Sequence, residues 1–321
     1  MRFSAVWVVL VVSLFNVCVA AEKTPIRIGV QSSGTLDWEL RVLKADATLN
    51  SQDFEVLITS LANAEAGKIA LQSGAVDMIV SDWIWVSSVI AVGGDLTFYP
   101  YSNTSGALIV PEKSSIHSLA DLKGKRLGIA GGELDKNWLL LQALGQKDKL
   151  NLSEMVEKTY AAPPLLNEQI KQERIDALLT YWNFAARLET QGYRQVIDGS
   201  QILKGLGVMV NVPSLGYVFN NGWAKTHKES LTHFLKATRL AKQQICNQDT
   251  VWQTVIPLTH VNDENTLVLL RQRYCQGSVE QWGEAEQHAA EQIYQLLRGV
   301  SHNQLTGNSE HVSQDAFWNL D

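Results

Sequence analysis

The sequence predicts an α/β protein of two similar lobes, each built on a mainly parallel sheet that is flanked by helices. One observation is that an apolar run in residues 76–83 follows a glycine and contains an aspartate, which is typical of a buried parallel strand. A second is that residues 175–182 repeat this pattern. A third is that the offset of this repeat, 99 residues, also relates residues 27–34 to residues 126–133. Each of these segments is typical of a strand, a turn of small residues and the start of a helix. Repetition at one offset indicates two units of like build.

Polar and aromatic residues stand where the two repeated strands end. Ser81, Asp82 and Trp83 end the first strand, and Tyr181 and Trp182 end the second. Ligands of open α/β sheets bind at the carboxyl ends of the strands. We therefore expect these side chains to face a ligand from two sides.

The N-terminus has the pattern of a secretory signal peptide. Arg2 precedes an apolar run at residues 5–15, and small residues follow the run. Residues 1–21 are therefore predicted to be removed when the chain is secreted. A membrane anchor is the alternative, although the run is shorter than the ~20 residues that a spanning helix needs. Lipidation at Cys18 is a weaker alternative, because the preceding residues do not match the small-residue context that it prefers.

Two cysteines remain after removal of the signal peptide, and both lie in the C-terminal part of the chain. An even number of cysteines in an exported chain is typical of a disulfide. We expect a bond between Cys246 and Cys275, with two buried thiols as the alternative.

Charge and motifs exclude several functional classes. The formal net charge of −6 argues against a nucleic-acid partner, which requires a basic patch. The sequence contains no His-Glu-x-x-His, Gly-x-Ser-x-Gly or Cys-x-x-Cys motif. We therefore predict that the protein is not an enzyme, with no catalytic residue, cofactor or metal site.

The order of the elements predicts that the second lobe is inserted into the first. An extended segment that ends at Pro111 leads into the second unit, and the segment at residues 213–220 leads back. The expected division is a first lobe of residues 25–110 and 214–300, a second lobe of residues 111–213, and a docked tail of residues 301–321. Helices are predicted at residues 36–47, 64–73, 87–92, 134–144, 165–172, 184–191, 230–247, 264–274 and 282–297 from their apolar spacing.

Five segments of this chain resemble one family. They are LQSGAVDMIVSDWIWV, SLADLKGKRLGIAGGELDKNW, APPL, YWNF and LGYVF. Together with the export signal and the inserted lobe, they resemble the type II periplasmic substrate-binding proteins of ABC transporters, in the nitrate, sulfonate and taurine class with its thiamine-precursor branch. The resemblance covers nearly all of the mature chain. It implies the type II periplasmic-binding fold, with a ligand cleft between the lobes.

The candidate ligand site collects polar and aromatic residues from both units and from the returning segment. They are Thr35, Asp37, Trp38, Ser81, Asp82, Trp83, Glu133, Asp135, Trp138, Tyr181, Trp182, Asn183 and Tyr217. Asp82 and Trp83 are the contacts that the pattern favours most. Helix N-termini after Gly34 and Gly132 would add backbone N–H groups.

Several of these residues also fit purely structural roles. Trp38 and Trp138 lie within predicted helices, where tryptophan commonly packs in the core. Asp37 could serve the first turn of its helix through the helix dipole. Asp77 and Asp176 precede the two buried strands and are expected to be structural rather than ligand-binding.

The charges at the candidate site favour a ligand that is neutral or cationic, aromatic or nitrogen-containing. Four acids and several aromatic rings stand there, whereas an anion site would be expected to show Arg or Lys. Lys136 is the basic residue in these segments, and with no other base nearby the ligand is expected to be the charge partner of Asp82.

The expected function is that of a monomeric periplasmic receptor that delivers a small ligand to an ABC permease and its ATPase. The alternative is an exported accessory or sensory protein of the same fold, which serves a periplasmic dehydrogenase or a signalling partner.

Overall fold

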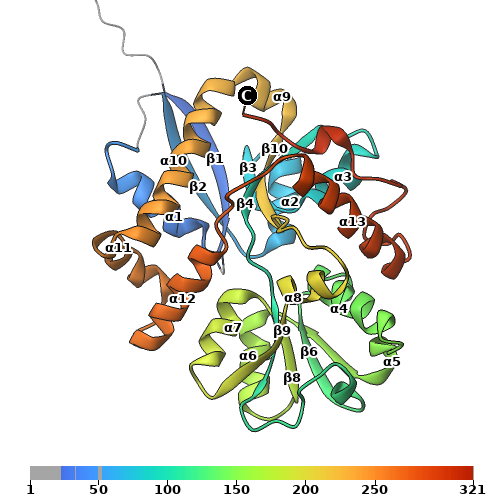
Figure 1. Cartoon of the computed structure of the whole chain (residues 1–321). Coiled ribbons are helices and arrows are strands. Elements are labelled where there is room, and N and C mark those ends of the chain that lie inside the picture. The colour runs from blue at the N-terminus through green and yellow to red at the C-terminus, as the bar shows by residue number, and fades with distance from the viewer. Residues whose placement is uncertain (1–22, 33, 50–52, 321) are drawn as a thin grey trace, which may run out of the picture.

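The computed structural model describes residues 23–320 except residues 33 and 50–52. The predicted signal peptide and Cys18 lie outside these residues. The chain forms two lobes, each with one five-stranded sheet and helices on its faces (Figure 1). This confirms the predicted two-lobed α/β class.

The two sheets have the same topology. The first has the order β2-β1-β3-β10-β4 and the second β7-β6-β8-β5-β9. In each sheet the first three strands are parallel, and the fourth, which is the strand that follows a crossing between lobes, runs antiparallel to both neighbours. The strands are β1 (Thr24–Gln31), β2 (Phe54–Leu61), β3 (Met78–Ser81), β4 (Leu96–Ser102), β5 (Ala107–Pro111), β6 (Arg126–Ala130), β7 (Glu157–Ala161), β8 (Ala177–Thr180), β9 (Tyr193–Asp198) and β10 (Leu215–Asn220).

An arginine–aspartate ion pair joins two neighbouring parallel strands at the same place in both lobes. Arg27 Nε donates to Asp77 Oδ2 at 3.0 Å, and Arg126 Nε donates to Asp176 Oδ2 at 3.1 Å. Each carboxylate also accepts the backbone N–H of its arginine, so it ties β1 to its neighbour β3 in the first sheet and β6 to its neighbour β8 in the second. This agrees with the structural role predicted for the two aspartates.

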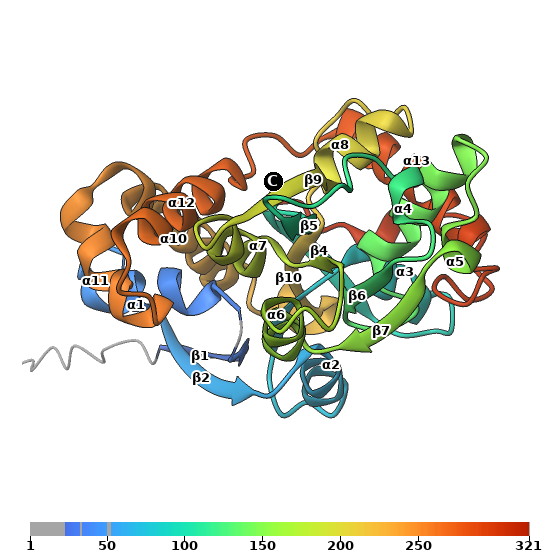
Figure 2. The ribbon, with the colours of Figure 1, turned by 90° about the horizontal axis from the view of Figure 1, so that it is seen from below.

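Helices cover the faces of both sheets, and a C-terminal group of helices joins the lobes. In Figure 2, α12 lies beside α7 of the second lobe and α13 lies beside α4. The helices are α1 (Leu36–Ala45), α2 (Ala64–Gln72), α3 (Trp83–Ile90), α4 (Lys136–Lys147), α5 (Leu152–Met155), α6 (Pro163–Lys171), α7 (Trp182–Glu189), α8 (Gly199–Gly205), α9 (Asn221–Thr226), α10 (Lys228–Asn247), α11 (Asp249–Thr259), α12 (Glu264–Gln276) and α13 (Glu284–Val300), with short 3₁₀ turns at Ala120–Leu122 and Gln314–Ala316.

The predicted strand from residue 76 ends earlier than expected. We expected the strand to extend to Trp83, but β3 ends at Ser81 and α3 begins at Trp83. The reason is a cap: the Asp82 carboxylate accepts the N–H of Trp85 at 2.9 Å, which satisfies one of the free donors of the first helical turn. In the second lobe, α7 likewise begins at Trp182, two residues before the predicted start.

The chain changes sheets before and after the second lobe. β4 belongs to the first sheet and β5 to the second, so the first crossing occupies residues 103–106, N-terminal to the expected crossing at residues 110 and 111. Near the chain end, the backbone N–H of Trp318 donates to the carbonyl of Phe98 at 2.8 Å, and the Trp318 ring lies 5.8 Å from that of Phe219.

A helix that spans a membrane must be both long and apolar. Among the described residues, no helix combines the length and the apolarity that crossing a membrane requires.

The predicted disulfide is present. Cys246 at the end of α10 is bonded to Cys275 at the end of α12. The bond therefore fastens the helix that packs on the second lobe to the long helix of the first lobe.

Candidate functional site

An ion pair connects the two lobes where the repeated strands end. Lys136 Nζ at the start of α4 donates to Asp82 Oδ2 at 2.8 Å, while Asp82 Oδ1 caps α3. The expectation that a ligand is the charge partner of Asp82 is therefore wrong for this structure. Lys136 and Asp82 are 54 residues apart in sequence, and only the folded arrangement brings the ammonium group across to the other lobe.

Burial and charge act against each other in this pair. Burial works to raise the pKa of the Asp82 carboxyl, but Lys136 and the N–H of Trp85 together lower it below its ordinary value. Burial works to lower the pKa of Lys136, but Asp82 and Asp135 raise it on balance. Both groups are therefore held in their charged forms at neutral pH.

The start of α4 gathers polar groups beside this ion pair. Asp135 caps the helix by accepting the N–H groups of Asn137 and Trp138 at 2.9 and 3.2 Å. Burial nevertheless raises the pKa of its carboxyl. Burial and the nearby Asp135 also raise the pKa of the Tyr181 hydroxyl to about 12, so Tyr181 remains a neutral hydrogen-bonding group. Glu133 is exposed at the same edge of the sheet.

Gly131, at the turn before α4, has a backbone that suits glycine. Its φ is +99°, and a Cβ there would lie 3.3 Å from the Tyr181 hydroxyl oxygen. A side chain at this position would therefore be strained and would crowd the strand end.

Aromatic rings form a second contact between the lobes. The Trp38 ring on α1 lies 6.4 Å from the Trp182 ring of the second lobe, in an edge-to-face arrangement. Tyr274 on α12 lies 5.0 Å from Trp38 and 6.4 Å from Trp182, and Trp252 on α11 lies 5.7 Å from Trp38. The prediction brought Trp38 and Trp182 together, but it missed Tyr274 and Trp252.

Beneath these rings lies a buried polar cluster, of which the sequence prediction had selected only Tyr217. We define the Glu39 cluster as Glu39, Tyr101, Tyr217, Lys242 and Tyr274. The Tyr101 hydroxyl donates to Glu39 Oε2 at 3.1 Å, and Lys242 Nζ lies 3.6 Å from Glu39 Oε1. Lys242 also donates to the Tyr101 carbonyl at 3.0 Å and lies 4.2 Å from the centre of the Tyr101 ring. Every side chain of the cluster is at most 9% exposed.

The remaining predicted residues are divided between the interlobe surface and the core. Trp83 is 2% exposed, and its indole N–H donates to the carbonyl of Pro213 on the returning segment, while Trp138 is 1% exposed in the core. Ser81 and Asn183 are buried, and Thr35 and Asp37 are half-buried at the start of α1. Trp138 thus has the packing role that was weighed as its alternative. Trp83, which the pattern favoured as a ligand contact, is also packed in the core.

Contacts between α7 and the C-terminal helices hold the lobes together on one side. Arg273 Nη2 pairs with Glu189 Oε2 at 2.7 Å, and the hydroxyls of Thr190 and Thr266 lie 2.6 Å apart. Arg187 donates to the carbonyl of Thr259 at 3.0 Å. The arrangement described here is therefore one in which the lobes are in contact.

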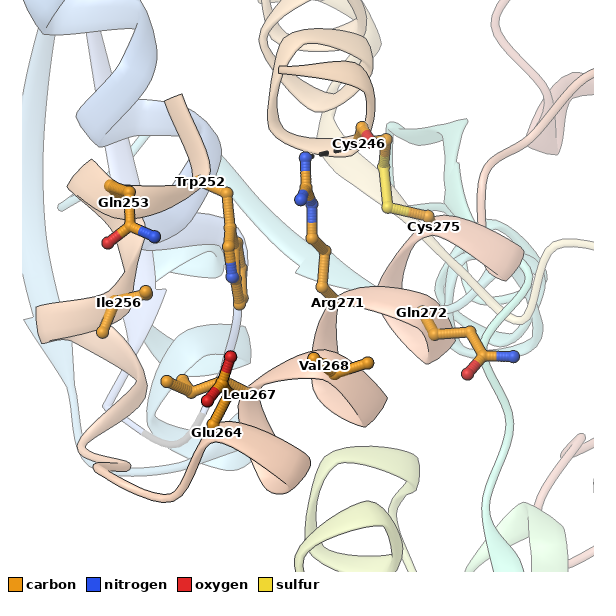
Figure 3. Close-up of a pocket in the computed structure, with 10 residues that line it drawn as sticks. All are labelled: Cys246, Trp252, Gln253, Ile256, Glu264, Leu267, Val268, Arg271, Gln272 and Cys275. Carbon is orange, nitrogen blue, oxygen red and sulfur yellow. Dashed lines mark hydrogen bonds between the residues drawn. A yellow bond between two sulfur atoms is a disulfide. The ribbon is translucent and has the colours of Figure 1, made fainter. Parts of the chain in front are cut away.

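A surface pocket lies elsewhere, on the outer side of α11 and α12. It has a volume of about 570 Å³ and is bordered by Trp252, Arg271 and the Cys246–Cys275 disulfide (Figure 3). None of the predicted ligand residues lines it. It is open to solvent, so we do not assign the ligand to it. Within the described ranges, no three His, Cys, Asp or Glu side chains are grouped so that they could hold a metal ion.

The Asp82–Lys136 pair predicts how stability depends on pH. The pKa of Asp82 is lower in the folded protein than in the unfolded chain. Its contribution to the free energy of unfolding is therefore fully present above the ordinary carboxyl pKa of about 4, and is lost as the pH falls through the lower pKa of the folded protein. We expect the stability difference between the parent protein and Asp82→Asn to be constant above roughly pH 5 and to shrink below about pH 4. Urea unfolding at several pH values measures this.

The control repeats this experiment with Lys136→Met in both proteins, so that Lys136→Met is compared with Lys136→Met/Asp82→Asn. Without the ammonium group, burial remains as the main influence on Asp82, so the sign of the pH dependence should reverse. An unchanged pH dependence in Lys136→Met would show that the ion pair does not set it.

Comparison with known proteins finds a matching family model and a similar protein of Escherichia coli. A family model described as "NMT1/THI5 like" matches residues 49–250. An aliphatic sulfonates-binding protein of Escherichia coli (strain K12) is 28% identical over 200 residues, and the match covers 59% of this chain and 60% of that protein.

Solved structures of similar fold cover almost the whole chain. The periplasmic aliphatic sulphonate binding protein SsuA from Escherichia coli superposes with a TM-score of 0.72 at 17% identity, covering 92% of this chain and 98% of that one. The alkanesulfonate-binding protein SsuA from Xanthomonas axonopodis pv. citri, bound to MOPS, gives 0.69 at 18% identity, covering 93% and 99%. These relatives are binding proteins rather than enzymes, and they share the predicted fold.

Proposed function

Because the chain belongs to the NMT1/THI5-like family, we propose that it is a periplasmic solute-binding protein that captures a small organic ligand by lobe closure and delivers it to an ABC importer. The observation that carries the proposal is the contact between strand ends of the first lobe and strand ends of the second. Asp82 and Trp38 of the first lobe meet Lys136 and Trp182 of the second. Contacts of this kind form when the lobes close and are lost when they open.

We propose hinges at the crossings between sheets. Residues 103–106 and the segment before β10 pass between lobes without belonging to either sheet. The Ser214 hydroxyl donates to the Thr104 carbonyl at 2.7 Å, so the two crossings lie side by side. Small-angle scattering should give a smaller radius of gyration with ligand than without it.

The ligand is proposed to be neutral or cationic, and aromatic or nitrogen-containing. The titles of the named relatives refer to sulfonates, which are anions. In this chain, Lys136 and Lys242 are each paired with a carboxylate, and aromatic rings lie beside them. Because each lysine already has a carboxylate partner, such a surface favours flat or positively charged ligand groups over an anionic one.

Native mass spectrometry of the protein purified from its own periplasm tests the function. We expect a bound small molecule that denaturation releases. Protein without any bound molecule, which also fails to take one up from a periplasmic extract, would contradict the proposal. A titration with MOPS, the molecule bound in one of the relatives, tests the charge class, and no binding is expected.

Trp182→Ala is expected to weaken binding of the recovered molecule about tenfold or more, because the loss of a stacking ring costs about 1–3 kcal/mol. Trp223→Ala is the matched control, since Trp223 on α9 is also half-buried but stacks on His227, and α9 lies far from the second lobe (Figure 1). Calorimetry measures both affinities. Equal losses in the two variants would place the ligand away from Trp182.

A further inference from the structure

The Glu39 cluster contains three polar atoms that are buried without a hydrogen-bond partner. They are Glu39 Oε1, the Tyr217 hydroxyl and the Tyr274 hydroxyl. Their residues are only 0%, 3% and 2% exposed. Buried polar groups are nearly always hydrogen-bonded, so three such atoms in one cluster require an explanation.

The contacts within the cluster do not supply the missing partners. Tyr101 occupies Glu39 Oε2, and Lys242 lies 3.6 Å from Oε1, which is an ion-pair distance but too long for a hydrogen bond. The Tyr274 hydroxyl is close enough to influence the pKa of Glu39, yet it does not make a hydrogen bond of good geometry. One oxygen of the carboxylate is therefore available to a donor.

By contrast, each carboxylate oxygen of Asp82 already has a donor within the protein. Its Oδ2 accepts from Lys136 and its Oδ1 accepts from the N–H of Trp85. The argument that a buried carboxylate needs a donor from the ligand thus applies to Glu39 rather than to Asp82.

The cluster lies directly behind the aromatic contact between the lobes. Glu39 follows Trp38 on α1, and the Tyr274 ring touches both Trp38 and Trp182. Trp182 comes from the second lobe, so opening the lobes withdraws it and uncovers the rings of Trp38 and Tyr274. Thr35, half-buried and one turn before Glu39, lies next to the Tyr101 hydroxyl on the same path.

We infer that the Glu39 cluster anchors the ligand, with Glu39 Oε1 accepting an N–H of the ligand and the hydroxyls of Tyr217 and Tyr274 binding polar atoms beside it. The ligand class is a flat group with an amidinium, amino or ammonium donor, whose faces contact Trp38, Trp182 and Tyr274. A sulfonate offers only acceptors and leaves Oε1 without a partner. Lys242 is a positioning residue, because it holds the Glu39 carboxylate against the Tyr101 carbonyl. This inference rests on the proposed function.

Calorimetry with two probes of equal shape and opposite charge tests it. Benzamidine carries an amidinium group on a benzene ring, and benzenesulfonate carries a sulfonate on the same ring. The mature protein is unfolded and refolded to remove bound molecules, then titrated with each probe and with the compound recovered by native mass spectrometry. We expect benzamidine to bind and benzenesulfonate not to bind.

Glu39→Gln should weaken benzamidine binding at least tenfold, because a charge-assisted hydrogen bond is lost. Since this variant also leaves Lys242 without its carboxylate, Tyr274→Phe is the second variant. It removes only one hydroxyl, and a loss of several-fold is expected with an unchanged melting temperature. Glu65→Gln is the control, because the Glu65 side chain is 75% exposed on α2, and it should bind like the parent protein.

Three outcomes would overturn the inference. Benzamidine affinity that neither variant changes, or a preference for benzenesulfonate, would do so while solute binding stands. If a compound is recovered but neither probe binds, the affinities of Glu39→Gln and Tyr274→Phe for that compound are measured instead. Affinities equal to that of the parent protein would then overturn the inference. Absence of any bound or recovered compound would remove the proposed function and this inference together.

Discussion

Replacing Lys242 by Met is expected to lower the free energy of unfolding by about 3–5 kcal/mol, because it leaves the Glu39 carboxylate buried without its cation. Lys242 is 7% exposed and Glu39 is 0% exposed, so water cannot replace the lost partner. Burial raises the pKa of Glu39 and lowers that of Lys242, although each group opposes the shift of the other. The desolvation of both charges therefore outweighs their attraction.

The double variant Glu39→Gln/Lys242→Met should recover at least half of that loss, since a neutral pair no longer buries an unpaired charge. Lys236→Met, at an exposed position of the same helix, is the control and should change stability by less than about 0.5 kcal/mol. Urea unfolding measures all three proteins. A Lys242→Met variant as stable as the control would show that the ion pair adds nothing to the fold.

The sequence contained a signal for this pair that the prediction did not use. Lys242 lies on α10 in phase with the buried residues Thr238 and Ile245, and Glu39 lies on α1 between the buried residues Trp38 and Leu40. A charged residue on the apolar face of a helix usually has a buried partner. The partner could not be identified from the sequence, because α1 and α10 are separated by most of the chain.

The family and the two-lobed fold were predictable for a different reason. The strands that build the core of each lobe repeat at one offset, and the repeat carries the Arg27–Asp77 and Arg126–Asp176 pairs with it. Strands β7 and β9 were not predicted, because they lie at sheet edges and are only partly buried, so they lack the apolar run of β3 or β8.

The ligand site was predicted only in part, since it depends on contacts between lobes. Sequence reasoning selected the strand ends, where Asp82 and Trp182 lie, because strand direction determines which end of a sheet faces the ligand. It could not show that Lys136 reaches across to Asp82, nor that α12 brings Tyr274 against Trp182. Those contacts depend on the angle at which the lobes meet.

Removal of the Cys246–Cys275 disulfide is the second large effect that we expect. The bond closes a loop with a sequence separation of 29, and the chain-entropy model gives about 3–4 kcal/mol for a loop of this size. Cys246→Ala/Cys275→Ala should therefore lower the free energy of unfolding by about that amount. Urea unfolding of the parent protein with and without a reductant provides an independent measurement.

The same change should weaken ligand binding, because the bond joins the two helices that carry Lys242 and Tyr274 of the Glu39 cluster. Cys275 follows Tyr274, and Cys246 lies one helical turn after Lys242. Without the bond, α12 can shift relative to α10 and carry Tyr274 away from Glu39. Thiol labelling of the unfolded, unreduced parent protein should detect no reactive cysteine in the mature chain, and two reactive thiols would exclude the bond. Unchanged affinity in the double alanine variant would show that α10 and α12 hold Tyr274 in place by packing alone.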